Sequence, residues 1–111
     1  MRYTFVVCAD EDADEVVDPE LQVGFAGFED RMRERGVLVT TNRLRPAVTA
    51  TTVKVRNGDL VIADGPFAET KEQIAGFDII ECADMQEAIR VAGAHPTTRH
   101  GTIEIRPFPA E

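Results

Sequence analysis

Residues that can hold a polar ligand or move a proton gather in two short stretches of the chain. The first is the stretch Asp-Gly-Pro-Phe-Ala-Glu-Thr-Lys at residues 64–71. Its first three residues are typical of a turn, because the Asp side chain accepts hydrogen bonds from backbone N–H groups, Gly permits unusual φ angles and Pro is rigid. Glu69, Thr70 and Lys71 then supply an acid, a hydroxyl and a base, which is enough to bind a polar ligand or transfer a proton. A structural loop with an internal ion pair, or a loop at a dimer interface, has the same composition.

We expect Phe67 to pin this loop to the hydrophobic core. If its ring is fully buried, replacement by Ala lowers stability by about 3–5 kcal/mol. The predicted ligand-binding residues of the stretch are Asp64, Gly65, Pro66, Phe67, Glu69, Thr70 and Lys71.

The second stretch, residues 95–100, holds both histidines of the chain and Arg99. Histidine titrates near neutral pH without perturbation, and Arg can clamp a carboxylate or phosphate. The stretch therefore predicts an acid/base and anion-binding loop. Alternatively, His95 lies at a helix C-terminus, where positive charge is favourable, and His100 is a surface residue.

Taken together, the candidate catalytic residues are Asp64, Glu69, His95 and His100, and Arg99 joins the predicted ligand-binding set. If the two stretches approach one another at one end of a sheet, they form the mouth of a single cleft. Nothing in the spacing of the histidines demands a metal site. Cys8 and Cys82 show no zinc-ligand spacing and are expected to be buried free thiols.

Composition limits the class of protein. The 111 residues, 43% apolar and 29% charged, predict one soluble domain over residues 1–111. No apolar run approaches the roughly 20 residues that cross a bilayer, and the N-terminal residues do not resemble a signal peptide, so we expect a cytoplasmic protein. No phosphate-binding, flavin, nicotinamide or haem-attachment motif is present, so no cofactor is predicted.

The net charge of −8 comes almost entirely from one acidic run, which is Asp10, Glu11, Asp12, Asp14, Glu15, Asp18 and Glu20. Such a run is either a solvated loop before a helix or a docking surface for a cation or a basic partner. The rest of the chain is nearly balanced in charge and has no basic stripe, which argues against nucleic-acid binding.

Hydrophobic periodicity predicts the elements that must position these residues. Strands are expected over 2–8, 37–44, 51–56, 60–63, 74–82 and 102–106, and helices over 18–35 and from 85 to about 94. Asp18 and Asp84 are expected to be the N-caps of the two helices, and Ile103 and Ile105 are expected to face inward from the last strand. Asn57-Gly58-Asp59 predicts a β-hairpin turn between the third and fourth strands. The stripe predicted to face the core is Leu21, Phe25, Phe28 and Met32 in the first helix and Met85, Ala88, Ile89 and Ala92 in the second.

Without the hairpin, this order is βαββαβ, which is the ferredoxin-like arrangement of an antiparallel sheet with two helices on one face. The opposite face carries apolar residues, and so small a chain has no further element to cover it. We therefore predict an α+β fold with an inserted hairpin that pairs with a second copy as a homodimer.

At residues 61–77, VIADGPFAETKEQIAGF, the chain resembles the DGPF branch of the YCII-related proteins in the dimeric α+β-barrel superfamily. The likeness extends to MRYTFVV, GVLVTTNRLRP, TATTVKVRNG and the ending GTIEIRPF. It implies a barrel formed by the sheets of two copies. Some superfamily relatives are muconolactone isomerases or monooxygenases, and DGPF members often accompany extracytoplasmic-function sigma factors in bacteria. YCII-type relatives carry a proposed His/Asp pair in the N-terminal half, which does not transfer because residues 1–94 contain no His.

Three hypotheses follow. The chain binds a small polar or anionic molecule in a dimer cleft, with a regulatory role beside a sigma factor. Alternatively, it is a cofactor-free isomerase or lyase that uses the same cleft, or a structural module that docks another protein. The sequence does not choose between an enzyme and a binding protein.

Overall fold

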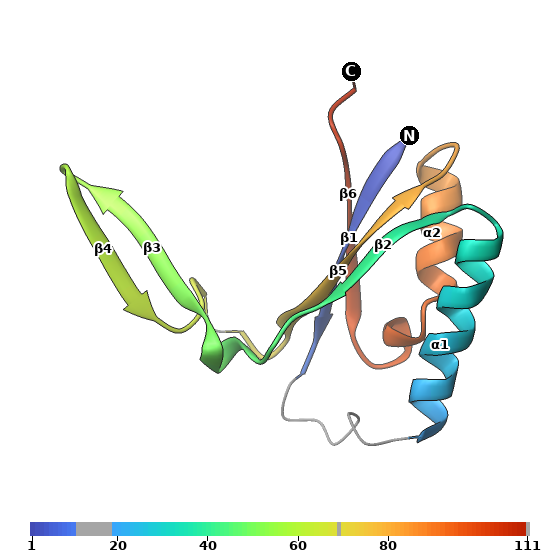
Figure 1. Cartoon of the computed structure of the whole chain (residues 1–111), viewed down its shortest axis with the longest axis horizontal. Helices are drawn as coiled ribbons and strands as arrows, with labels where there is room; N and C mark the ends of the chain where they lie inside the picture. The colour runs from blue at the N-terminus through green and yellow to red at the C-terminus, as the bar shows by residue number, and fades with distance from the viewer. Residues whose placement is uncertain (11–18, 69, 111) are drawn as a thin grey trace.

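The computed structural model describes residues 1–10, 19–68 and 70–110 (Figure 1). Its elements are β1 (Arg2–Ala9), α1 (Pro19–Glu34), β2 (Leu38–Arg43), the 3-10 helix η2 (Ala47–Thr49), β3 (Thr51–Arg56), β4 (Asp59–Asp64), β5 (Gln73–Glu81), α2 (Met85–Ala94), the 3-10 helix η3 (Pro96–Arg99) and β6 (Thr102–Pro107). The predicted Asp18 cap of α1, most of the acidic run and Glu69 lie outside the described residues.

Four strands form an antiparallel sheet in the order β2-β5-β1-β6, and β3 pairs only with β4. This is the predicted ferredoxin-like order with a hairpin inserted between the second and third strands of the main sheet. The start of β5 and the start of β6 both flank the end of β1, because Cys8 lies opposite Ile74 on one side and Thr102 on the other. The topology thus brings the C-terminal ends of the two predicted functional stretches to the same end of the sheet, next to the last residues of β1.

Both helices cover one face of the main sheet (Figure 1). Alternation along β1 turns Tyr3 and Phe5 toward the helices, and both are buried. The core is Tyr3, Phe5, Phe28, Met32, Val37, Ile80, Cys82, Ala88, Val91 and Ala92. Ile103 and Ile105 of β6 pack against it from the predicted inward positions.

The predicted apolar stripe of α2 is wrong in one position. Ile89 is 51% exposed, whereas Val91 is 3% exposed and belongs to the core. Ala88 is shared by two overlapping stripes with helical spacing, and the helix is rotated so that the stripe containing Val91 packs inward. The predicted N-cap is confirmed, since the Asp84 side chain accepts a hydrogen bond from the Glu87 N–H at 2.9 Å.

The hairpin of β3 and β4 stands apart from the rest of the chain as an arm, which we define as residues 51–64. Asn57 and Gly58 have φ angles of +53° and +80°, the positive values that a tight two-residue turn requires. Figure 1 shows the arm leaving the main sheet on the side that the helices do not cover. The radius of gyration is 15.9 Å, compared with roughly 13 Å for a compact chain of this length.

Candidate functional site

The DGPF turn is held by hydrogen bonds at the base of the arm. Gly65 has a φ of +99°, in the left-handed region that favours glycine, directly after β4 ends at Asp64. Its N–H donates to the Ala50 carbonyl at 2.8 Å, and its carbonyl accepts from the Thr52 hydroxyl at 2.8 Å. The turn therefore closes on the start of β3 through the backbone of Gly65.

Phe67 does not anchor this loop, so the expectation that its ring is pinned to the core is wrong. The ring is 91% exposed. The hydrogen bonds at Gly65 hold the turn instead, and the turn lies at the arm, away from the core layer between sheet and helices (Figure 1). An aromatic ring left in water on a fixed turn is available to a ligand or to another protein chain.

The far end of the DGPF stretch is also held. The Thr70 hydroxyl donates to the Glu72 carbonyl, and the Gln73 side-chain amide donates to the Thr70 carbonyl at 2.9 Å. Thr102, at the start of β6, donates to the Glu72 carboxylate at 2.8 Å. The side chains of Asp64, Thr70 and Lys71 are exposed. Both ends of the stretch are thus fixed, while four of its predicted ligand-binding side chains, Asp64, Phe67, Thr70 and Lys71, face solvent.

The second stretch divides into a buried and an exposed part. His95 follows the last residue of α2 and is only 6% exposed, whereas Arg99 is exposed and His100 is half-buried. The hydrogen bond from Thr102 to Glu72 links the DGPF stretch to the strand that follows this one. That the two stretches line one cleft stays a prediction.

The imidazole of His95 belongs to a buried hydrogen-bonded chain. Its Nε2 lies 3.3 Å from Oδ2 of Asp78, and both side chains are 7% exposed. The other oxygen of Asp78, Oδ1, accepts a hydrogen bond of 2.6 Å from the Thr41 hydroxyl. The ring's Nδ1 accepts a 3.1 Å hydrogen bond from the Thr97 N–H. Because Nδ1 is an acceptor, the ring proton lies on Nε2, which donates to the carboxylate.

This arrangement occupies both nitrogens of the ring. Phe28 and Phe25 also pack against it, with centroids 4.9 and 5.7 Å from the imidazole centroid. His95 therefore connects α1, the end of α2, η3 and the main sheet, and it presents no free nitrogen to a substrate. To accept a proton from a ligand, Nδ1 would have to be released by the Thr97 N–H, and to donate one, Nε2 would have to leave the Asp78 carboxylate.

Sequence reasoning missed Asp78. It lies inside the apolar run of β5, two residues before the buried Ile80 and on the same helix-facing side of the sheet. A carboxylate at a core position of a strand is the signal, because such a group is buried only with hydrogen-bonding partners. The pair it forms with His95 comes from the C-terminal half of the chain, unlike the N-terminal pair proposed for YCII-type relatives.

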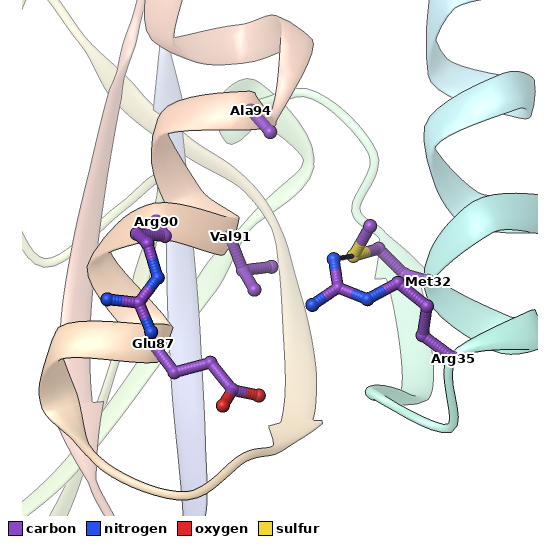
Figure 2. A pocket seen from close by; sticks show the side chains of 6 residues that line it. All are labelled: Met32, Arg35, Glu87, Arg90, Val91 and Ala94. Carbon is purple, nitrogen blue, oxygen red and sulfur yellow. Dashed lines mark hydrogen bonds between the residues drawn. The ribbon is translucent and has the colours of Figure 1, made fainter.

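A small pocket of about 210 Å³ lies between α1 and α2. Its lining residues are Met32, Arg35, Glu87, Arg90, Val91 and Ala94 (Figure 2). Met32 lies in the last turn of α1, Arg35 directly follows that helix, and the others come from α2. Two guanidinium groups and one carboxylate around an apolar floor suit a small anion or zwitterion. Neither predicted stretch contributes to this pocket.

The two cysteines are free, and their surroundings keep them protonated. Burial raises the pKa of the Cys82 thiol above its ordinary value of 9.0, and the nearby Glu87 adds to the effect. Burial likewise raises the pKa of Cys8, helped by Glu104 and Glu72. A raised pKa lowers the thiolate fraction at neutral pH, so neither thiol is suited to nucleophilic catalysis.

The described residues contain neither a cluster of metal ligands nor a helix suited to crossing a membrane. In that part of the chain, no three His, Cys, Asp or Glu side chains gather in a way that could hold a metal ion. Neither α1 nor α2 has the combination of length and apolar character that a membrane crossing requires.

Comparison with known proteins assigns the family. The sequence matches the YCII-related domain over residues 1–108, and the chain therefore belongs to the YCII-related family. It is also similar to an uncharacterised protein of Rhizobium meliloti (strain 1021), with 44% identity over 79 residues. That alignment covers 68% of this chain and 62% of the Rhizobium protein, so the chain spans less than two thirds of its relative.

Proposed function

We propose that this YCII-related protein is a cytoplasmic homodimer that binds a small polar or anionic molecule at the DGPF stretch. The observation that supports this function most directly is the 91% exposure of Phe67 on a turn that Gly65 holds in place. The stretch is anchored at both ends, yet the side chains of Phe67 and Lys71 are exposed. A ring and a cation on a fixed loop suit a ligand with an apolar body and a negative charge.

The second subunit has a clear role in this proposal. An exposed loop hides little of a ligand, whereas binding sites bury most of a small ligand's surface. A partner copy that packs near the loop supplies the missing wall, which gives the dimer cleft predicted from the sequence. The single domain over residues 1–111 then forms one half of a site that lies between two subunits.

The experiment is a thermal-shift panel of small carboxylates, phosphates and zwitterions, followed by calorimetric titration of every compound that raises the melting temperature. We expect at least one compound to bind, and the variants Phe67→Ala and Lys71→Gln to weaken it about tenfold or more. Lys54→Gln is the matched control, because Lys54 is an exposed lysine on the arm. Binding that survives both variants, or a panel without any binder, contradicts the proposal.

The pocket between the helices is a competing location, and one variant separates the two. Arg90→Ala removes a guanidinium from that pocket without touching the DGPF stretch. If Arg90→Ala abolishes binding while Lys71→Gln leaves it intact, the ligand lies between α1 and α2 and the DGPF assignment is wrong.

A second function, acid/base catalysis by an isomerase or lyase, is favoured by the buried hydrogen bond between Asp78 and His95. A carboxylate that orients an imidazole is a common catalytic arrangement. However, both ring nitrogens of His95 already take part in hydrogen bonds within the protein. The other candidates, Asp64 and His100, do not belong to the hydrogen-bonded group of Thr41, Asp78, His95 and Thr97. Incubation of each confirmed ligand with the protein, followed by mass spectrometry and NMR of the product, tests it. If the wild-type protein converts a ligand and the His95→Gln variant does not, the result supports acid/base catalysis by an isomerase or lyase.

The regulatory role beside an extracytoplasmic-function sigma factor rests on the DGPF resemblance. Its test is co-purification with the sigma factor of the same organism, with and without a confirmed ligand. Ligand-dependent association supports a sensing role. Binding to a protein partner without any small ligand favours the structural module instead.

A further inference from the structure

One face of the arm is apolar and has no partner within the described residues. Antiparallel pairing places Val53 opposite Ile62 and Val55 opposite Leu60, so these four side chains share a face. Each is more than half exposed, at 57% and 62% for the first pair and 59% and 63% for the second. The opposite face is mainly polar, with Lys54 beside Val61 and Arg56 beside Asp59.

A two-stranded hairpin with one apolar face does not stabilise itself. Isolated hairpins are marginal in water, and they become stable when an apolar face packs against something else. Within the described residues, the arm hydrogen-bonds to the rest of the chain near its base, where Gly65 meets Ala50 and Thr52, and it points away from the helices (Figure 1). The apolar face of the arm therefore needs another apolar surface to pack against, and the described residues of its own chain do not cover it.

The same chain has a second uncovered apolar surface, which is the open face of the main sheet. The strand registers place Val6 opposite Phe77 and Thr4 opposite Ile79, on the side of β1 and β5 that faces away from the helices. Charged residues lie further out on this face, where Arg2 pairs with Glu81 and Glu104 with Arg106. The face thus has an apolar centre with polar borders, as a protein interface does.

We propose that the arm packs its apolar face, Val53, Val55, Leu60 and Ile62, onto the open sheet face of a second copy of this chain. This inference rests on the homodimer of the proposed function and adds the contact that forms it. The arm leaves each copy on the side of its open face (Figure 1). A two-fold axis then makes the arms of both copies reach across the open faces of their partners.

The contact area agrees with this partner. Two strands of six residues make a face about 20 Å long and about 10 Å wide. In a two-fold dimer, two arms and two receiving faces of about 200 Å² each are covered. The buried surface is then roughly 800 Å², if each face is treated as flat. This is about half of the roughly 1,600 Å² of a standard stable interface, and in this proposal the parts of the open faces that the arms leave uncovered supply the rest.

The contact also gives the DGPF loop its second wall. Phe67 follows the base of the arm within three residues of Asp64, so an arm that crosses a partner brings this ring beside the partner's sheet. The exposed aromatic ring and the exposed arm then belong to one interface, and a ligand at Lys71 is enclosed between two copies.

The test is the dimer dissociation constant of the full-length chain, measured by analytical ultracentrifugation. Val55→Lys and Leu60→Lys place a charge at the centre of the apolar face. Because two-fold symmetry repeats each charge, we expect dissociation to rise about 100-fold. The matched control is Val61→Lys, which adds the same charge to the opposite face of the same hairpin and is expected to change the constant by less than about threefold.

A crosslinking experiment locates the contact without depending on lost binding. Benzoylphenylalanine in place of Leu60 is expected to form covalent dimers on irradiation, with crosslinked peptides from β1 or β5 of the other copy. Crosslinks only within one chain overturn the arm contact.

The outcomes separate the two proposals. A wild-type chain that stays monomeric at micromolar concentration overturns the homodimer and the arm together. A wild-type dimer that Val55→Lys and Leu60→Lys leave as tight as Val61→Lys overturns the arm alone, and the dimer of the proposed function then forms by another surface.

Discussion

Removing the carboxylate of Asp78 is expected to destabilise the fold more than any surface charge does. In Asp78→Ala, the Nε2–H of His95 loses its acceptor in a position where the side chain is 7% exposed. A buried donor without an acceptor costs about 1–3 kcal/mol. The Thr41 hydroxyl loses its 2.6 Å acceptor as well, but it is only half-buried and water replaces part of the loss. We expect Asp78→Ala to lower the free energy of unfolding by about 2–4 kcal/mol.

Asp78→Asn tests whether the charge or the hydrogen bonds matter more. The amide oxygen still accepts from His95, and the Thr41 hydroxyl can turn to accept from the amide nitrogen. Only the charge assistance is lost, so we expect a loss of about 1–2 kcal/mol. Asp30→Ala is the control, because Asp30 is exposed on α1 and its removal is expected to stay within about 0.5 kcal/mol.

The interaction between the two side chains follows from a double-mutant cycle. His95→Ala leaves the Asp78 carboxylate buried without its imidazole, which costs about 3–5 kcal/mol. The double variant loses both partners, so its loss is expected to be smaller than the sum of the single losses by about 1–3 kcal/mol. The measurement is urea unfolding followed by circular dichroism, at one fixed protein concentration because the chain is proposed to dimerise.

Two results would refute this reasoning. One is an Asp78→Ala variant as stable as Asp30→Ala, which would mean that the carboxylate contributes nothing where it is buried. The other is strict additivity in the double variant, which would mean that Asp78 and His95 do not interact in solution.

Three further expectations concern the backbone and the thiols. Gly76→Ala should lower the melting temperature markedly, since a Cβ at this position meets the backbone carbonyl of Asn42 in β2. Gly58→Ala, at a φ of +80°, should cost about 1–2 kcal/mol by thermal unfolding, and a neutral result would mean that the turn adopts another conformation. Since burial raises the pKa of Cys8 and Cys82 above 9.0, the unfolded chain loses these protons first. The contribution of these two thiols to the unfolding free energy should therefore be constant below pH 8 and fall above pH 9, and Cys→Ser variants of both should make the fall above pH 9 shallower than in the wild type.

Local sequence signals predicted most of the fold, because capping residues and turn residues mark where helices and strands begin and end. Asp84 caps α2, and Asn57-Gly58 forms the turn of the arm. These features depend on residues close in the chain. The order of the strands followed from the same elements, because a βαββαβ chain has few compact arrangements.

The errors concern contacts between distant residues. The pair of Asp78 and His95 joins β5 to the end of α2, and no spacing rule connects positions 78 and 95. Phe67 is apolar, and apolar character alone predicts burial. Its exposure follows from the direction of the arm, which carries the loop away from the core layer (Figure 1). The rotation of α2 toward Val91 likewise depends on its packing into the core that distant residues form, and this packing has no local sequence signal.

The buried and exposed features lie on opposite sides of the main sheet, which decides how they can act together. Asp78, His95 and Thr41 lie in the layer between the sheet and the helices, where they fix the helices to β2 and β5. The arm leaves on the other side, together with the open sheet face. β5 is common to both, because alternation turns Asp78 toward the helices and Phe77 toward the open face. One strand thus separates the buried Asp78–His95 hydrogen bond from the face on which we propose that a partner copy packs.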